Sequence, residues 1–231
     1  MCPPRVENAC ATGSAALHGA MDFIAAGRGR IALVVGAEKM TATPTAEVGE
    51  ILLGASFHAE EAQIDAGFAG LFGQIAASYF QRHGDRSEEL AMIASKNHQN
   101  GLRNPYAHMR KDLDVAFCNT VSDRNPRVAG PLRRSDCSLV LADAETAMTM
   151  PRAIAFRARV QANDPLALSR RDVLEMRAAR SAWRQALDRA GVTLDDLSLV
   201  ETHDCFTIAE MLEYEAMGLT EPGQGHRAIR E

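Results

Sequence analysis

The chain has few aromatic residues, no long apolar run and no regular cysteine pattern. Aromatic side chains make up 5% of the 231 residues, too few for the stacking platforms that bind single-stranded nucleic acid. No segment approaches the roughly 18 to 20 consecutive apolar residues that a membrane-spanning helix needs. The five cysteines are odd in number and scattered, so they do not indicate a disulfide framework. We therefore predict no membrane span and no nucleic acid as a main partner.

The rest of the composition is typical of a globular protein. Hydrophobic residues make up 46% and charged residues 24%, and the formal net charge is −5. These values argue against disorder and give no electrostatic reason to bind nucleic acid. Residues 1–5 lack the apolar core of a signal peptide, and unpaired thiols suit a reducing compartment. The sequence predicts a cytoplasmic protein with one large domain or two small ones.

The chain begins with a cysteine that is followed by small side chains. Cys10 precedes the segment 11–27, where small residues occupy nearly every face, so we expect a central, buried helix. Residues 31–37 form a continuous apolar run, which favours a strand covered on both faces, as in a parallel sheet. Such a helix and strand need further layers, which nine preceding residues are too few to supply.

The middle of the chain is predicted to be helical and irregular. Apolar side chains in the segment 67–83 fall on one stripe, which predicts a helix that ends at Gly84. Ser87 is expected to cap a second helix that runs to about Asn97. The segment 97–106 is polar and rich in turn residues, so it is predicted to be a loop.

The last third returns to the alternation of strands and helices that is typical of an α/β fold. Two apolar runs predict strands at 137–142 and 197–202, and an alternating pattern predicts a half-exposed strand at 154–160. An apolar stripe over 176–190 predicts a helix that ends at Gly191.

Two capping boxes are also predicted in this part of the chain. Ser169 and Asp172 have the spacing of such a box, in which two side chains bond the first backbone N–H groups of a helix. Thr207 and Glu210 have the same spacing, and they predict a helix that runs to Met217. Polar residues therefore gather where the predicted strand 197–202 ends and this helix begins, which is where ligand sites form in α/β sheets.

Two positions carry side chains that suit acyl transfer. Cys10 stands just before a helix, where backbone N–H groups and the helix dipole favour a thiolate, the nucleophile for thioester exchange. His203 stands beside Asp204 at a strand end, where it could hydrogen-bond a developing oxyanion or exchange a proton. From position alone, either residue could instead be structural. A metal site at His203 and Cys205 is not favoured, because no CxxC or HxxxH spacing accompanies them.

The segments around these two residues match a known pattern. Residues 6–14 read Val-Glu-Asn-Ala-Cys-Ala-Thr-Gly-Ser, and residues 203–206 read His-Asp-Cys-Phe. They resemble two motifs of the thiolase family, in particular its sterol-carrier-protein-X type, which has His where other thiolases have Asn. Further segments resemble this type at 97–98, 104–106 and 131–138. The resemblance implies that Cys10 is the catalytic nucleophile and that His203 belongs to an oxyanion hole.

The resemblance also implies a fold class and a domain organisation. The fold would be α/β, a thiolase-like layered αβαβα arrangement that is incomplete here and carries an inserted helical and loop subdomain. Residues 1–53 would form part of the N-terminal half with the nucleophile, and residues 54–135 the loop subdomain, which helps to bind CoA. Residues 136–231 would complete that half and begin the C-terminal half. The strand at 31–37 would lie at the interface of a homodimer or higher oligomer.

The sequence departs from the family in its outer parts. A complete thiolase has a sizeable segment before its nucleophile, and near its C-terminus a Gly-His-Pro motif with the base and a Cys-x-Gly motif. Residues 225–227 read Gly-His-Arg, so the role of the base is not assigned to His226. The Asp-Gly-Ala-Ala-Ala stretch that usually follows the strand at 137–140 is also absent. The chain resembles an internal fragment, and we expect it to be weak or inactive in condensation.

The activity implied is that of an acyl-CoA C-acyltransferase, which forms or cleaves a C–C bond through an acyl-cysteine intermediate. Acyl-CoA would be the substrate, with no bound cofactor and no metal. An inactive assembly subunit beside a small OB-fold partner is one alternative. A retro-aldolase-type lyase is another, although the presence of Cys10 counts against it. Four arginines could contact CoA phosphates or form a solvated face: Arg124, Arg127, Arg133 and Arg134.

Overall fold

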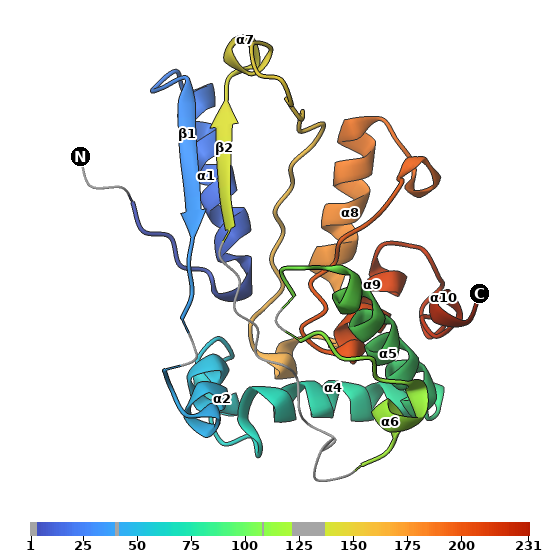
Figure 1. Cartoon of the computed structure of the whole chain (residues 1–231). Helices are drawn as coiled ribbons and strands as arrows, with labels where there is room; N and C mark the ends of the chain where they lie inside the picture. The colour runs from blue at the N-terminus through green and yellow to red at the C-terminus, as the bar shows by residue number, and fades with distance from the viewer. Residues whose placement is uncertain (1–3, 40–41, 108, 122–136) are drawn as a thin grey trace. The chain divides into compact units, whose positions relative to one another are not determined.

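The computed structural model of the chain divides into two compact units (Figure 1). The structure describes residues 4–39, 42–107, 109–121 and 137–231. The first unit comprises Met1–Ala42 and Arg134–Arg159, and the second comprises Thr43–Arg133 and Val160–Glu231. Each unit therefore joins two stretches of the chain. The division at 53/54 and 135/136 that the sequence predicts stays a prediction.

The first unit is built on a two-stranded antiparallel sheet. Strand β1 (Ile31–Gly36) pairs with β2 (Cys137–Ala142), with Ile31 opposite Ala142 and Gly36 opposite Cys137. Helix α1 (Thr12–Ala25) packs against this pair (Figure 1). The short helix α7 (Ala144–Ala147) follows β2. The predicted strands at 31–37 and 137–142 are thus confirmed.

The burial that the sequence predicts for this helix and strand is wrong in the described chain. Helix α1 has no buried residue, and along β1 the side chains are exposed or half-buried. Leu33 and Val35 of β1 are 63% and 64% exposed. The partner of β1 is also antiparallel, not parallel. One helix and two strands shield only the surfaces that face one another, so small or apolar side chains on the other faces stay open to solvent.

The second unit is a bundle of helices. Helix α4 spans Gly67–His83, as predicted, and ends at Gly84, whose φ of 83° suits a residue without a Cβ. It packs with α9 (Thr207–Ala216), which also contacts α5 (Ser87–Arg103) and α8 (Arg177–Ala190), and α4, α5 and α9 supply most of an apolar core. The residues of this core are Leu53, Leu71, Ile75, Tyr79, Ile93, Leu174, Ile208, Met211 and Leu212.

Several short elements precede, connect or follow these helices. They are α2 (Thr45–Leu53), α3 (His58–Glu61), α6 (Val115–Asn119), η2 (Leu168–Arg170), η3 (Leu194–Asp196) and α10 (Arg227–Arg230). Among the described residues, no helix is both long enough and apolar enough to cross a membrane.

Helix α5 begins differently and runs further than the sequence predicts. Ser87 is its first residue, not its cap, because the hydroxyl and the N–H of Ser87 both donate to Asp85, at 2.5 and 2.8 Å. The helix continues to Arg103, so much of the predicted loop 97–106 is helical. The polar residues of this stretch form a helix face that bonds to other elements, which a polarity pattern alone does not distinguish from a loop.

Two predicted strands are absent from the structure. Residues 154–160 are irregular, with Ile154 90% exposed, and the first unit ends within them at Arg159. Residues 197–202 are irregular as well. They lie in the second unit, whose described residues contain no sheet. A strand needs a neighbouring edge to satisfy its backbone groups, and no such edge is formed at either segment.

The two predicted capping boxes are also wrong, although the helices beside them are confirmed. The Ser169 hydroxyl donates to Glu60 at 2.5 Å, and Asp172 accepts from Arg82 at 2.6 Å, before α8 begins. Helix α9 begins at Thr207 without a side-chain cap. Tertiary partners have taken the side chains of Ser169, Asp172 and Glu210 that the boxes would use.

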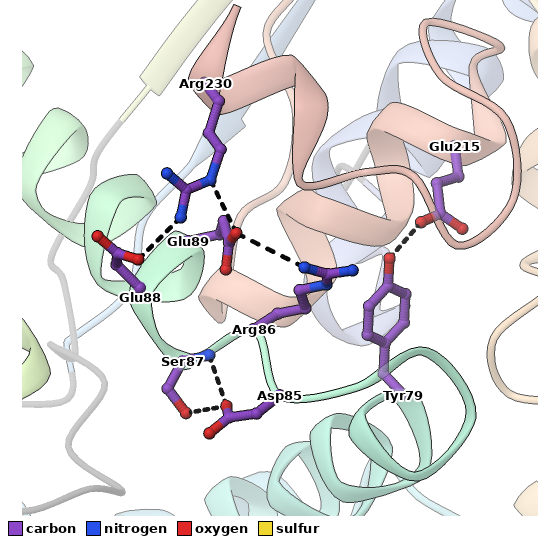
Figure 2. Close-up of polar contacts among 8 residues, drawn as sticks. All are labelled: Tyr79, Asp85, Arg86, Ser87, Glu88, Glu89, Glu215 and Arg230. Carbon is purple, nitrogen blue, oxygen red and sulfur yellow. Dashed lines mark hydrogen bonds and ion pairs between the residues drawn. The ribbon is translucent and has the colours of Figure 1, made fainter.

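Ion pairs connect helix α10 to the start of α5 (Figure 2). The Arg230 guanidinium donates to Glu89 and to Glu88, at 2.8 Å each. The buried Glu89 carboxylate also lies 3.9 Å from Arg86. These arginines lower the pKa of Glu89 against the opposing effect of its burial. The last residues of the chain are therefore held to the second unit by charge.

Candidate functional site

Cys10 lies at the start of α1, in the single 3₁₀ turn η1 (Ala9–Ala11). The preceding Ala9 has a φ of 45°, in the left-handed region that residues with a Cβ rarely adopt. Thr12 closes this turn, because its hydroxyl accepts from the Asn8 N–H and donates to the Ala9 carbonyl, both at 2.7 Å. The Cys10 side chain is exposed, so a ligand can reach it from solvent.

The first N–H groups of α1 follow directly after Cys10. The cap residue Ala11 offers no side-chain acceptor to them. N–H groups at a helix start have no partner within the helix, and they carry partial positive charge. The Thr12 N–H is bonded to the Ala9 carbonyl, so the structure places an exposed thiol at a helix start that lacks a side-chain cap.

His203 lies in the second unit, four residues before α9. The predicted strand before it is absent, and the side chain of His203 is exposed. The N–H of Cys205 donates to the His203 carbonyl at 3.0 Å, which closes a tight turn over residues 203–205. We call residues 203–206 the His203 turn. Its position depends on the side chains on either side of His203.

Phe206 fixes one end of the His203 turn to helix α4. Its ring stacks on Phe72, with centroids 4.4 Å apart and planes at 20°. Phe68 lies at the edge of the same group, 6.0 Å from Phe206. Aromatic pairs of this geometry stabilise by about 0.5–1.5 kcal/mol beyond the area they bury.

Asn97 of α5 holds the other side of the turn. Its Nδ2 donates to Oδ2 of Asp204 at 2.5 Å and to Oε2 of Glu210 at 2.8 Å. One neutral amide thus uses both of its hydrogens to bridge two carboxylates. The bridge connects the residue after His203 to helices α5 and α9, which lie side by side (Figure 1).

Glu210 is the centre of this polar network. Its side chain is 5% exposed, and it accepts hydrogen bonds from Lys96, Asn97 and Tyr214. Lys96 also lies 3.1 Å from the Tyr214 hydroxyl. Burial and the bond to Glu210 raise the pKa of Tyr214 well above its usual value. A buried carboxylate is tolerated when it is paired and hydrogen-bonded, and both conditions hold here.

A second carboxylate with an altered pKa lies beside the turn. Burial raises the pKa of Glu213 to about 7, against the opposing effects of a hydrogen bond with the Thr202 side chain and the charge of His203. Asp204 and Glu210 add to the rise by like-charge repulsion. The Oε2 atom of Glu213 is buried and has no hydrogen-bond partner. This carboxyl group can therefore change its charge near neutral pH.

A hollow of about 270 Å³ adjoins the network. Lys96, Glu210 and Tyr214 supply its polar side, and Leu197 and Leu199 belong to its apolar side. Leu199 is 75% exposed, because the segment 197–202 joins no sheet. Among the described residues, no group of His, Cys, Asp and Glu side chains has a geometry that could hold a metal ion.

The structure describes the two predicted site residues in separate units. Cys10 belongs to the first unit and His203 to the second, and each is described within its own unit. The four arginines singled out in the sequence lie outside the described residues. Sequence reasoning did not find Lys96, Asn97, Glu210 and Tyr214 as a network. The signals available were the Asn-His pair at 97–98 and a carboxylate at 210, which was interpreted as a helix cap.

Two family descriptions cover most of the chain. Residues 2–120 match "Thiolase, N-terminal domain", and residues 160–231 match "Thiolase C-terminal domain-like". The chain belongs to the thiolase family, which confirms the resemblance seen in its motifs. Acetyl-CoA acetyltransferase of Methanothermobacter thermautotrophicus is 34% identical to it over 241 residues, 98% of this chain and 60% of that protein. The chain thus spans about three fifths of that relative's length.

Solved structures confirm the fold class. The Ltp2-ChsH2(DUF35) aldolase matches with a TM-score of 0.77 and 14% identity, over 96% of this chain and 59% of that chain. A monomeric SCP2-thiolase like protein type 1 from Mycobacterium smegmatis matches with a TM-score of 0.64 and 21% identity, over 90% of this chain and 47% of that chain. The chain therefore has part of an α/β, thiolase-like fold.

Proposed function

We propose that this chain carries the acyl-accepting site of an acyl-CoA C-acyltransferase of the thiolase type. The observation that carries the proposal is the exposed Cys10 at the start of α1, which has no side-chain cap, within a segment that matches the thiolase N-terminal domain. The 34% identical acetyl-CoA acetyltransferase supports the same reaction class. The substrate is then an acyl-CoA thioester.

The first step is a transfer of an acyl group between two sulfur atoms. The Cys10 thiolate attacks the thioester carbonyl, a C–S bond to Cys10 forms, and the C–S bond to CoA breaks. Cys10 releases its thiol proton to solvent before the attack, and the departing CoA thiolate takes up one proton from solvent, so charge and atoms balance. N–H groups at the start of α1 favour the anionic sulfur that this step requires.

In this proposal His203 stabilises the negative oxygen that develops on an acyl group. An imidazole N–H can donate to an oxyanion, and such donors are most effective when their position is fixed before reaction. The contacts of Phe206 and Asp204 restrict the His203 turn in that way. The role requires His203 to lie next to the reacting carbonyl in the assembled enzyme.

We further propose that condensation by this chain alone is impaired. The Gly-His-Pro and Cys-x-Gly motifs are absent from its sequence, and His226 does not replace them. His226 precedes α10, and its Nδ1 is buried without a hydrogen-bond partner. Robust thiolysis of acetoacetyl-CoA by the purified 231-residue chain would contradict this part of the proposal.

The acyl-accepting role is tested by incubating the purified chain with acetyl-CoA and measuring its intact mass. We expect one acetyl group, which peptide mapping places on Cys10, and release of one CoA. An unmodified chain under conditions in which the folded state is verified would contradict the proposal. That outcome would favour an assembly subunit without catalytic activity.

A lyase is the second candidate, because a solved structure with the same fold is an aldolase. Such an enzyme would cleave a C–C bond by retro-aldol chemistry, and no acyl group would pass through cysteine. Incubation with a β-hydroxyacyl-CoA separates the two candidates. Release of a carbonyl product without any Cys10 adduct favours the lyase.

Partners and location are also part of the proposal. The open edge of β1 and its exposed Leu33 and Val35 support a homodimer or higher oligomer through this strand. The matched aldolase pairs Ltp2 with ChsH2(DUF35), which supports a small partner protein such as an OB-fold subunit. The solved relative from Mycobacterium smegmatis is called monomeric, so light scattering has to decide the oligomeric state. The cytoplasmic location stays a prediction.

A further inference from the structure

Asn97 of α5 makes hydrogen bonds to two residues that are distant in the sequence. It lies on α5, 107 positions before Asp204, and it spends both amide hydrogens on Asp204 and Glu210. It is the donor that Oε2 of the buried Glu210 shares with the exposed Asp204. Like charges in contact repel, and a buried acceptor without a donor costs free energy.

Lys96, the neighbour of Asn97, makes this arrangement possible. Its ammonium group pairs with the Oε1 side of Glu210, while Asn97 donates to Oε2. The cation therefore balances the charge of Glu210 and leaves the amide free to hold Asp204. Lys96 and Asn97, which are consecutive residues of α5, thus bond to different oxygen atoms of the Glu210 carboxylate.

The bond to Asp204 acts on the residue that precedes it. His203 is held in a tight turn whose Cys205 N–H bonds its carbonyl. Phe206 anchors the far end of the turn on Phe72, and Asn97 anchors the middle through Asp204. With two anchors on two helices, the backbone that carries the His203 side chain is held in place although the segment before it is irregular.

We propose that Asn97 is a positioning residue for His203. It acts through Asp204, and it has no contact with substrate in this proposal. The inference rests on the proposed function for its catalytic consequence, because His203 must take part in acyl transfer for its position to affect a rate. The structural consequence, a less ordered His203 turn when Asn97 is replaced, does not depend on that function.

The catalytic experiment is a double-mutant cycle on the full chain. The rate of Cys10 acetylation by acetyl-CoA is measured for the wild type, Asn97→Ala, His203→Ala and the double variant. We expect Asn97→Ala to lower the rate at saturating acetyl-CoA by about 10-fold to 100-fold, the usual cost of a misplaced catalytic group. The half-saturating concentration should be unchanged. In the His203→Ala background the same change should have no further effect, because coupled residues are not additive.

The structural experiment separates this inference from the proposed function. Hydrogen exchange of the Cys205 amide and the imidazole NMR signal of His203 are recorded for the same chains. We expect at least tenfold faster exchange and a shifted or sharpened imidazole signal in Asn97→Ala. Asn100→Ala, an exposed asparagine on the same helix, is the matched control and should change neither. Asn97→Asp, which keeps the shape and removes the donors, should behave as Asn97→Ala does.

Each outcome has one interpretation. Unchanged exchange and an unchanged imidazole signal in both Asn97 variants overturn the inference, whatever the enzyme activity. Rate losses that are equal in the wild-type and His203→Ala backgrounds overturn it as well. If the wild type takes up no acetyl group while the turn loosens in the variants, the proposed function fails and the positioning role stands.

Discussion

Tyr79 and Glu215 are joined by a buried hydrogen bond across 136 positions of sequence (Figure 2). The phenol of Tyr79 donates to Oε1 of Glu215 at 2.7 Å, and the same oxygen accepts from the Gly225 N–H at 2.9 Å. Burial and this bond raise the pKa of the Tyr79 hydroxyl well above its usual value. Gly225 can approach so closely because it has no Cβ. A Cβ at this position would lie 2.5 Å from the Met211 carbonyl oxygen. One carboxylate therefore connects α4, α9 and the segment before α10.

Replacing Tyr79 by Phe should destabilise the second unit. The ring would stay in the core, but Glu215 would lose one of its two donors in a buried place, which costs about 1–3 kcal/mol. Urea unfolding followed by circular dichroism measures the change in the free energy of unfolding. Tyr106→Phe is the control, because Tyr106 is 93% exposed and its change should be within about 0.5 kcal/mol. Equal effects of the two substitutions would show that the bond to Glu215 adds no stability.

Replacing Cys10 by Ala should abolish the acetyl adduct and leave the fold unchanged. The side chain is exposed, so its loss opens no cavity. Intact-mass measurement after incubation with acetyl-CoA checks the adduct, and circular dichroism checks the fold. Cys118→Ala is the control and should still be acetylated at Cys10, because burial raises the pKa of the Cys118 thiol and makes it a poor nucleophile. If an adduct forms at the same rate in Cys10→Ala, the nucleophile is another residue.

Replacing His203 by Ala should slow acetylation by about 10²-fold to 10³-fold, the usual cost of removing one oxyanion donor. The rate is measured by intact-mass analysis of samples taken over time at saturating acetyl-CoA. His58→Ala, an exposed histidine of α3, should leave the rate unchanged. A loss smaller than threefold in His203→Ala would remove this residue from the oxyanion hole.

Glu213 should make the protein less stable as the pH rises through the neutral range. Its folded pKa of about 7 lies above the ordinary value of 4.5, so the folded state keeps a proton that the unfolded state has released. The stabilisation is complete below about pH 4.5 and is lost as the pH rises from there to about 7. This loss is on the order of 1–3 kcal/mol for a group that is still partly exposed.

Urea unfolding at pH 5 and at pH 7.5 tests this for the wild type and Glu213→Gln. The difference in unfolding free energy between the two pH values should be smaller in the variant, which has no carboxyl group at this position. Glu231→Gln is the control, because Arg227 lowers the pKa of Glu231 and so moves its titration below this window. An identical pH dependence in wild type and Glu213→Gln would mean that Glu213 titrates normally.

Local patterns predicted those elements that depend on neighbours in sequence. The bounds of α4, the end of α8 at Gly191, and the strands β1 and β2 follow from apolar spacing and from glycine, whose freedom of φ is a property of the residue itself. The motifs around Cys10 and His203 indicated the family because they are short and contiguous. Neither required knowledge of what lies across the fold.

Tertiary structure alone decided the pairings that join distant residues. The segment 197–202 has the composition of a strand, but it forms none because the second unit offers it no sheet edge among the residues described. Glu210 has the spacing of a helix cap, yet its carboxylate is bonded to Lys96, Asn97 and Tyr214, which bury and balance it more fully than a helix start could. Propensity acts over a few residues and is weak, whereas a buried charge must find its partners wherever the fold brings them.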